Sequence, residues 1–516
     1  MTEHFNDIVI GSGSAGAVVA ARLSEDSGRT VLLIEGGPDY RQANLPADVL
    51  DGTGPCTTSH DWGYQADSGI GGRAVPYLRG RILGGTSSIN TAMALRGTHQ
   101  DFAEWVGKYG ATNWSFEELL PFFNKLENDT EFHGAGHGAD GPIRIYRSPF
   151  GEVVPIQAAF ESACVELGYK RIDDFNNPDT DTQSGVGPCP FNVTPGEVVR
   201  QSTLIGYVEP SRDRPNLTIV ADHVADRVLF SGEKATGVVT SNGGVQIEFT
   251  ADRIIISAGS IGTPALLIRS GIGPIDQLEA LRVEPSVVRE GVGRNLREHV
   301  FTPIILRGLP EVCGAADPNV QQIMRFTATG SEEANDMQML MLSNLNMGGA
   351  LGRGGGEFMP ALYPGLQRPH STGSVALAST DPEDAPIVNL GFLSDPWDRE
   401  RLAEGVRLAI DLAETAALGE ATDGFIDFDP EIAEHDDSIQ EYLDATVLPG
   451  FHASGTARIG TGEDPMAVVD GELRVHGVSN LYVADASVMP NIVRANTNIT
   501  TIMIGERAAD ILRRLG

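Results

Sequence analysis

The segment at residues 7–16 reads DIVIGSGSAG, a short apolar run followed at once by the pattern G-x-G-x-x-G. The next residues, 17–23, are mostly small and apolar, as expected of a helix that packs closely on a sheet. A second apolar run, Thr30 to Ile34, ends at Glu35. Strand, glycine-rich turn, helix, strand and acid, in this order, predict the first unit of a dinucleotide-binding α/β fold.

Each glycine of the pattern has a separate physical role. Gly11 permits the tight turn, Gly13 lets backbone N–H groups approach a pyrophosphate, and Gly16 lets helix and strand touch. The helix N-terminus adds the positive end of its dipole. Glu35 lies 19 residues after Gly16, the spacing at which a carboxylate meets a ribose hydroxyl. That carboxylate would repel a 2′-phosphate, but the pattern alone does not separate NAD from FAD.

Five further segments carry glycines, hydroxyls or chemically active side chains. Alone, each has an ordinary interpretation, such as a turn that ends in a helix cap. The segments are GRILGGTSSIN at 80–90, GSIGTPALLIRSGIG at 259–273, HASGTAR at 452–458, LYVADAS at 481–487 and ANTN at 495–498. Together with the N-terminal pattern, and in this order, they resemble the glucose–methanol–choline (GMC) oxidoreductase family. Within that family the chain is similar to bacterial choline oxidases and to hydroxymethylfurfural- or pyridoxine-type alcohol oxidases.

The resemblance implies a Rossmann-type FAD-binding domain, a substrate domain built on an antiparallel sheet with flanking helices, and oxidation of alcohols to carbonyls. Some members carry a histidine just before the asparagine of the segment at 80–90 and link it to the flavin. Here that residue is Ile89, so we expect non-covalent FAD. The residues that the resemblance assigns to FAD are Gly11, Gly13, Ser14, Ala15, Gly16, Glu35, Arg81, Gly84, Gly85, Ser88, Asn90, Thr91, Ala92, Met93, Val224, Ala258, Gly259, Asp485, Ala486, Asn496, Asn498 and Ile499.

Oxidation of an alcohol needs a base for the hydroxyl proton and an acceptor for the carbon-bound hydride. Histidine suits the first task because its ordinary pKa is about 6.5. By resemblance, His452 is the base and Asn496 anchors the substrate oxygen; capping of the last helix is the other role open to Asn496. Trp62, Met93 and Phe451 are expected to line the substrate pocket.

Other histidines receive structural interpretations. His133 and His137 lie in a glycine-rich loop with too few ligands for a metal, and we expect no metal site. His299 follows Arg297-Glu298 and is expected to be structural. His370 is a weaker candidate for the pocket.

The FAD-binding domain is predicted to be discontinuous, over 1–48, 78–100, 197–300 and 448–516. The substrate domain takes 149–196 and 301–447, and 49–77 and 101–148 are connecting or lid regions. We expect helices at 497–515 and 402–416, and strands at 336–342, 373–378 and 304–306. The segment MGGALGRGGGE at 347–357 is either a surface loop or a lid hinge.

Composition narrows the class of protein. The chain has 516 residues and a net charge of −33, which argues against a nucleic-acid partner and against anionic membranes. No apolar run is long enough for a membrane span. The four cysteines have no metal-ligand spacing, and the N-terminus lacks the layout of a secretory signal, so we expect a cytoplasmic protein. A homodimer is compatible with the sequence, which does not decide the oligomeric state.

Four functions remain open at this stage. The first is an alcohol oxidase that passes electrons to O₂ and releases hydrogen peroxide. The second is a dehydrogenase of the same fold with a quinone or carrier-protein acceptor. The third is a non-redox flavoprotein of the hydroxynitrile-lyase kind, and the fourth is a non-catalytic flavin-binding protein. The substrate is equally open among aromatic or heteroaromatic, pyridoxine-like and choline-like alcohols.

Overall fold

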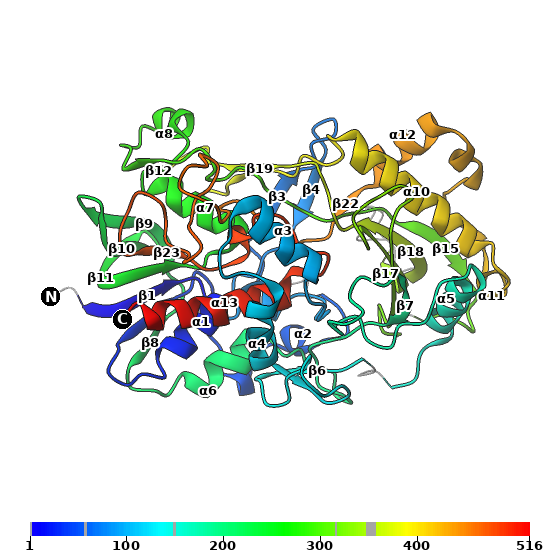
Figure 1. Cartoon of the computed structure of the whole chain (residues 1–516), viewed down its shortest axis with the longest axis horizontal. Coiled ribbons are helices and arrows are strands. Elements are labelled where there is room, and N and C mark those ends of the chain that lie inside the picture. Colours follow the sequence, from blue (N-terminus) through cyan, green and yellow to red (C-terminus); the bar gives the residue numbers. More distant parts are fainter. Residues whose placement is uncertain (1–2, 56–58, 148–150, 315–316, 347–357) are drawn as a thin grey trace.

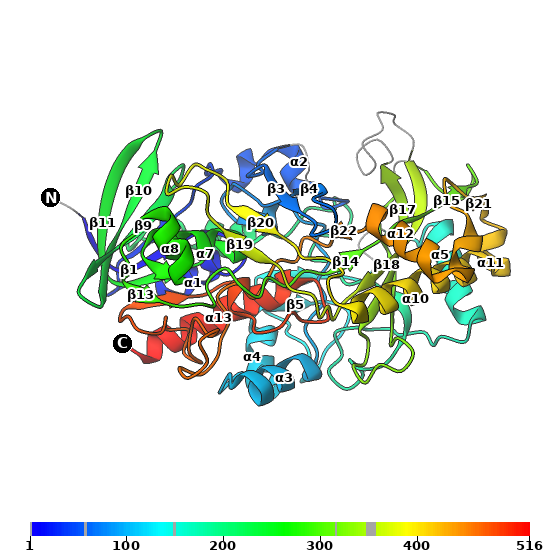
Figure 2. The ribbon, with the colours of Figure 1, turned by 90° about the horizontal axis from the view of Figure 1, so that it is seen from above.

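The computed structural model describes residues 3–55, 59–147, 151–314, 317–346 and 358–516. Cys56 and the glycine-rich segment at 347–357 lie outside these residues. Two large sheets lie toward opposite ends of the molecule, and helices and loops fill the space between them (Figure 1). Figure 2 shows the same separation from above.

The first large sheet has seven strands in the order β8-β2-β1-β11-β10-β9, with β23 beside β11. Its parallel centre joins β1 to β2 and β11, and β11 to β23, whereas β9, β10 and the start of β11 form an antiparallel meander. The bounds are β1 His4–Ile10, β2 Val31–Ile34, β8 Leu217–Val220, β9 Val224–Ser231, β10 Lys234–Asn242, β11 Val245–Ile256 and β23 Leu481–Val483. Every residue of β2 is buried, as expected of a central parallel strand.

Helix α1 (Gly16–Leu23) begins where β1 ends, and it packs against the last helix, α13 (Thr497–Arg514). The two helices approach closely at Gly505, where a Cβ atom would lie 2.8 Å from the carbonyl oxygen of Ala15. In Figure 1 they run side by side along the first sheet. The chain ends therefore meet at the glycine-rich turn, although they are separated by nearly the whole sequence.

The second large sheet has eight strands, all antiparallel, in the order β21-β15-β18-β17-β16-β7, with β14 pairing both β18 and β22. Its bounds are β7 Gly185–Pro188, β14 Val300–Phe301, β15 Ile304–Gly308, β16 Gln322–Phe326, β17 Met337–Asn346, β18 Phe358–Leu366, β21 Thr422–Phe425 and β22 Leu448–Pro449. Its helices are α5 Pro155–Glu166, α10 Pro396–Ala413, α11 Ala416–Gly419 and α12 Asp436–Thr446.

The smaller elements connect these two parts. A four-stranded sheet joins β3 Tyr64–Asp67 and β4 Ala74–Tyr77 to β19 Ser374–Ala376 and β20 Ile387–Asn389. Two-stranded sheets pair β5 Glu127–Asp129 with β6 Ile143–Ile145, and β12 Ile272–Gly273 with β13 Val287–Val288. The remaining helices are α2 Ala47–Leu50, α3 His99–Tyr109, α4 Phe116–Leu126, α6 Glu209–Ser211, α7 Gly259–Arg269 and α8 Ile275–Leu281. Short helical turns are η1 Gln42–Asn44, η2 Gly85–Ser88, η3 Leu204–Val208, η4 Pro430–Glu434 and η5 Ala486–Val488.

The mixed α/β class with an antiparallel second sheet is confirmed. The expected helix at 497–515 is α13, and the helix expected at 402–416 is α10, which begins six residues earlier, at Pro396. The strands expected at 336–342, 304–306 and 373–378 correspond to β17, β15 and β19. The division into domains stays a prediction. Strands of the segment 49–77 do pair with strands of the predicted substrate domain. Among the helices of the described residues, none has the length and hydropathy needed to cross a bilayer.

Candidate active site

A cavity of about 1050 Å³ lies between the two large sheets. Its wall includes Ile10, Ile34 and Ser257, at the carboxyl ends of β1, β2 and β11. Leu345 of β17 and Tyr363 of β18 contribute to the wall from the second sheet. Ligands of open α/β sheets bind outside the carboxyl ends of the parallel strands. The cavity is therefore where the sequence predicts a dinucleotide, and it continues into the predicted substrate domain.

The glycine-rich turn after β1 forms one part of the wall. Gly11 has φ +95°, and a Cβ atom there would lie 2.3 Å from the carbonyl oxygen of Ser257. A Cβ atom at Gly16 would lie 1.9 Å from the carbonyl oxygen of Gly11. A Cβ atom at Gly13 would meet nothing nearer than the Cα of Gly85, at 4.0 Å. Gly11 and Gly16 thus permit close packing of the protein, whereas Gly13 leaves the cavity open.

The second glycine cluster packs directly on the first. The N–H of Gly84 donates to the carbonyl oxygen of Ser12 at 3.1 Å. Gly84 and Gly85 both have positive φ, +91° and +53°, which β-carbon-bearing residues rarely adopt. A Cβ atom at Gly85 would lie 2.7 Å from the Cα of Gly13. The two segments can form one surface because neither carries a side chain at their contact.

Two buried acids on the wall are held by backbone N–H groups. Glu35 accepts hydrogen bonds from the N–H of Ser12 at 3.0 Å and from the N–H of Gly37 at 2.9 Å. Asp485, just after β23, accepts from the N–H of Gly259 at 2.9 Å, at the start of α7. Burial raises the pKa of both carboxyl groups above their ordinary values. Both acids therefore stabilise the backbone turns of the wall and border the cavity at the same time.

Two asparagines of the cavity wall each carry a buried polar atom without a partner among the described residues. Asn498 accepts a hydrogen bond from the Ser14 hydroxyl at 2.8 Å, but its Nδ2 atom is buried without a partner among the described residues. The Oδ1 atom of Asn496 is likewise buried without a partner. Buried polar atoms normally have partners, so these amides indicate a polar ligand. The open Gly13 backbone and the two amides fit the nucleotide and the polar ring of FAD.

The expected base and the expected oxygen anchor are in direct contact. The Nδ2 atom of Asn496 lies 3.0 Å from the Nε2 atom of His452 and 3.7 Å from the sulfur of Met93. Asn496 does stand at the N-cap position of α13, but its side chain makes no capping hydrogen bond. The N-cap position of Asn496 is therefore confirmed, while its amide contacts His452 and makes no side-chain cap.

The hydrogen bonds around His452 determine which of its nitrogens carries the proton. The carbonyl of Val493 can only accept, so the Nε2 of His299, 3.1 Å away, donates to it. The Nδ1 of neutral His299 must then accept, and it lies 2.9 Å from the Nδ1 of His452, which donates. The Nε2 of neutral His452 is therefore unprotonated and faces Asn496 and the cavity.

Burial keeps both imidazoles neutral. It lowers the pKa of His299 to about 3. Burial also lowers the pKa of His452 well below its ordinary value, and the nearby His299 and Arg79 lower it further. An unprotonated Nε2 is thus the resting form of His452 at neutral pH.

The backbone before His452 is strained and firmly held. Phe451 has φ +62°, a conformation that is unfavourable for a bulky residue and that recurs at functional sites. Its carbonyl accepts from Arg79 at 2.9 Å, and the N–H of His452 donates to Glu298 at 2.7 Å. Glu298 also accepts a hydrogen bond from the Tyr77 hydroxyl. Burial raises the pKa of Glu298 to about 7.

The structure places most of the predicted FAD residues on the cavity wall. Those on the wall are Gly11, Gly13, Ser14, Ala15, Glu35, Arg81, Gly85, Asn90, Thr91, Met93, Val224, Ala258, Gly259, Asp485, Ala486, Asn496 and Asn498. Five others lie behind it: Gly16, Gly84, Ser88, Ala92 and Ile499. The three residues predicted for the substrate pocket, Trp62, Met93 and Phe451, all line the same cavity.

Trp62 lines the cavity beside Gly36, and its place in the substrate pocket stays a prediction. Its ring packs against Gly36, where a Cβ atom would lie 2.8 Å away, stacks on Tyr64, and has the Arg81 guanidinium 4.5 Å above it. Gly36 follows Glu35, so the indole borders the nucleotide side of the cavity. His370 does not line the cavity; its ring is exposed and stacks on Trp397.

His137 belongs to a buried ionic network. Its Nδ1 lies 2.9 Å from Glu127, and its Nε2 lies 2.9 Å from Asp174. Arg147 pairs with Asp174 at 2.7 Å and also with Asp129. Although burial acts to lower it, these carboxylates raise the pKa of His137 to about 10. With these partners the protonated ring donates from both nitrogens. His133 is exposed. Glu127, Asp129 and His137 lie close enough together to ligate a metal ion, so the expectation of no metal site stays a prediction.

Sequence reasoning missed three contributors to this geometry: Glu298, Arg79 and the carbonyl of Val493. It also expected His299 to be merely structural, whereas the ring contacts His452 directly. The only sequence signal was the position of Glu298 and His299 in a segment typical of the resemblance. Spacing along the chain gave no indication that this segment lies beside residue 452.

Comparisons with known proteins show the family to which the chain belongs. Models of the GMC oxidoreductase family match residues 5–301 and 369–505. An oxygen-dependent choline dehydrogenase of Ectopseudomonas mendocina is 34% identical over 557 residues, covering 99% of this chain and 94% of the relative. The crystal structure of pyridoxine 4-oxidase from Mesorbium loti superposes with a TM-score of 0.89 at 28% identity, covering 99% of each chain. A formate oxidase variant of Aspergillus oryzae has a TM-score of 0.89 at 23% identity, covering 99% of this chain and 98% of the variant. At this low identity the similarity shows the fold alone.

Proposed function

Because the chain belongs to the GMC oxidoreductase family, and is therefore an oxidoreductase of CH–OH donors, we propose that it oxidises a primary alcohol to the aldehyde with non-covalent FAD. The observation that carries the proposal is the unprotonated Nε2 of His452 beside the amide of Asn496. Both face a cavity whose other walls are the glycine-rich turns.

We propose that FAD, when bound, supplies the acceptor for the hydride from the alcohol carbon. The turns at Gly11–Gly16 and Gly84–Gly85, with Glu35, would hold its nucleotide part. Asn498, which lines the same cavity, would help to hold the cofactor. The N-terminus of α13 faces the same cavity, and its dipole stabilises negative charge there. Ile89, which has no nucleophilic atom, is the basis for proposing non-covalent attachment.

The chain's own residues perform the proton step. In the resting structure the Asn496 amide occupies the lone pair of His452 Nε2. A substrate hydroxyl placed between the two side chains would donate its proton to Nε2 and accept from the amide. Removal of that proton makes the alcohol carbon a better hydride donor, and general-base assistance of this kind contributes about 10²–10⁴-fold. Because burial and neighbouring groups lower the pKa of His452, the base is ready to accept at neutral pH.

The cavity wall near His452 supports an aromatic or heteroaromatic alcohol. Met93 contacts Asn496, Phe451 precedes His452, and Leu345 and Tyr363 line the same cavity from the second sheet. Tyr363 stacks on Phe301 with ring centres 4.9 Å apart. Two of the proteins named above act, by their names, on choline and on pyridoxine, so choline-like and pyridoxine-like alcohols belong in any substrate panel. We propose O₂ as the electron acceptor and the cytoplasm as the location; both rest on the sequence alone.

The test is a panel of alcohols scored for flavin bleaching without oxygen, followed by peroxide detection on readmission of air. Benzylic and pyridylmethyl alcohols should bleach the flavin faster than aliphatic ones of equal size. Peroxide at one equivalent per aldehyde supports the oxidase. Turnover only with an artificial acceptor indicates the dehydrogenase, and a flavin that no alcohol bleaches refutes the proposal and favours a lyase-type activity.

A further inference from the structure

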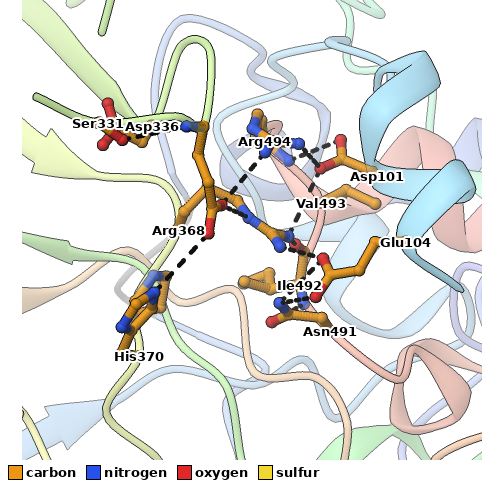
Figure 3. A network of polar contacts seen from close by, with 12 residues as sticks. Asp101, Glu104, Ser331, Asp336, Arg368, His370, Asn491, Ile492, Val493 and Arg494 are labelled. Atoms are coloured by element: carbon orange, nitrogen blue, oxygen red, sulfur yellow. Dashed lines mark hydrogen bonds and ion pairs between the residues drawn. The ribbon is translucent and has the colours of Figure 1, made fainter. Parts of the chain in front are cut away.

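A second cluster of polar side chains surrounds the segment that leads into α13 (Figure 3). Arg368, just after β18, donates to the carbonyl of Ile492 at 2.6 Å and pairs with Glu333 at 2.7 Å and with Glu104. Arg494 donates from Nη1 to Asp101 at 2.6 Å and from Nη2 to Glu333 at 3.2 Å. The side chains of Asp101, Arg368 and Arg494 are at most 5% exposed. The cluster therefore joins α3, the loop before β17 and the end of β18 around residues 491–494.

Side chains of the cluster and of its neighbours bind four backbone polar groups of residues 491–494. The carbonyl of Asn491 accepts from the Trp105 indole at 3.0 Å. The carbonyl of Ile492 accepts from Arg368, and the N–H of Arg494 donates to Asp101 at 3.0 Å. The carbonyl of Val493 lies between these fixed points and accepts from His299. Asn496 follows three residues later.

We propose that the buried network of Asp101, Arg368 and Arg494 positions the catalytic base. It does so by fixing the Val493 carbonyl, which holds His452 in the tautomer with an unprotonated Nε2. The proposal rests on the role proposed above for His452.

The electrostatics favour a rigid network. Burial acts to raise the pKa of Asp101, but Arg494 and Arg368 outweigh it and hold that pKa below its ordinary value. If one charged side chain of the network is removed, the charges that remain are buried without a partner of opposite sign. The remaining side chains then rearrange. A shift of the Val493 carbonyl would remove the acceptor that fixes His299. The two rings could then exchange to the opposite pair of tautomers, in which the Nε2 of His452 is protonated and cannot act as a base.

The chain offers a matched control for this test. Arg253 is also buried and also donates both to a carboxylate, Asp7 at 2.7 Å, and to a backbone carbonyl, that of Leu512. Its carbonyl partner lies at the opposite end of α13 from Asn496. Arg253→Met therefore removes the same kind of interaction, and the hydrogen-bond partners of Arg253, Asp7 and Leu512, are not among the residues around the base.

The experiment compares Arg368→Met, Arg368→Lys and Arg253→Met in the FAD-loaded protein. Long-range ¹H–¹⁵N spectra of ¹⁵N-histidine-labelled enzyme report the tautomer of His452, whose signals are identified by their loss in His452→Gln. Arg368→Met should show a mixture of tautomers, and its flavin-reduction rate should fall about five- to tenfold at every pH above the pKa of the base, as expected from loss of one hydrogen bond. In Arg368→Lys, which still donates to Ile492, the tautomer and the reduction rate should be closer to those of the wild type. In Arg253→Met both should equal those of the wild type.

The proposal would be overturned if Arg368→Met kept the wild-type tautomer of His452 and the wild-type reduction rate per bound flavin. It would also be overturned if Arg253→Met changed the tautomer and the rate as much as Arg368→Met does. If Arg368→Met does not fold, Asp101→Asn is measured in its place, with the same expected direction. The spectra require no substrate. If no alcohol reduces the wild-type flavin, the proposed function fails, while a tautomer shift in Arg368→Met would still support the positioning role.

Discussion

Substitution of Gly13 and Gly16 separates two roles that the same glycine pattern combines. In Gly16→Ala the new carbon would lie 1.9 Å from the carbonyl oxygen of Gly11 and 2.8 Å from the Cβ of Ser257. Normal contact is roughly 3.3 Å, so α1 or the turn must move by more than about 1 Å. Overpacking of this size costs about 3 kcal/mol or more. At roughly 1–2 °C per kcal/mol for a cooperative unit of about 250–500 residues, the melting temperature should fall by about 3–6 °C.

Gly13→Ala should behave in the opposite way. Its new carbon meets no protein atom nearer than 4.0 Å, so the protein itself should melt within about 1 °C of the wild type after removal of the flavin. The methyl group would instead enter the cavity. If steric crowding by this methyl group weakens FAD binding by about 1–3 kcal/mol, the affinity for FAD should fall about 5- to 150-fold.

The assay measures flavin per protein after gel filtration, the dissociation constant for added FAD, and melting of the flavin-free protein. Wild-type affinity in Gly13→Ala would refute the assignment of this turn to the cofactor. An unchanged melting temperature in Gly16→Ala would refute the packing argument.

Three further predictions follow from the same geometry. Acid precipitation should release all of the yellow colour, because Ile89 offers no atom for a covalent link; colour that stays in the pellet contradicts this. Glu35→Ala should lower the affinity for FAD, measured by titration, while the rate of flavin reduction at saturating FAD stays near that of the wild type; normal affinity with lost chemistry would disprove the role of Glu35. His137→Gln should melt lower than the wild type by the largest margin below pH 6.5. The margin should shrink toward pH 10, because a raised pKa contributes stability that is lost as the folded group deprotonates; a constant margin would show that the ring is not charged.

The local parts of this structure could be predicted from the sequence. The apolar run before Gly11 is the end of β1, the helical periodicity after Asn496 is α13, and the glycines have the expected steric roles. These features depend on neighbours within a few residues or on backbone conformations that only glycine adopts easily. The pattern therefore contains most of the information needed for the cofactor half of the cavity.

The long-range contacts could not be predicted in this way. Strand β14 pairs with β22, so that Val300 lies opposite Pro449, and this register brings His299 beside His452 although 153 residues separate them. Periodicity within either segment does not encode that register. The polar network at Arg368 could not be predicted from the sequence either, because its members come from separate elements.

Two local side-chain positions also depend on tertiary contacts. Asn496 stands at the N-cap of α13, but its amide contacts His452 and makes no capping hydrogen bond. The absence of a side chain at Gly36 lets the indole of Trp62 pack over that residue.

The most direct test of the account is the rate constant for anaerobic flavin reduction by the best alcohol of the panel, in wild type and in His452→Ala. We predict a loss of about 100-fold or more in the variant, with FAD fully bound, because the hydroxyl proton has lost its acceptor. The wild-type rate should stay constant from alkaline pH through neutrality and fall only well below pH 6.5, as the lowered pKa of His452 requires. A variant that reduces its flavin at the wild-type rate would contradict the central claim that His452 is the base.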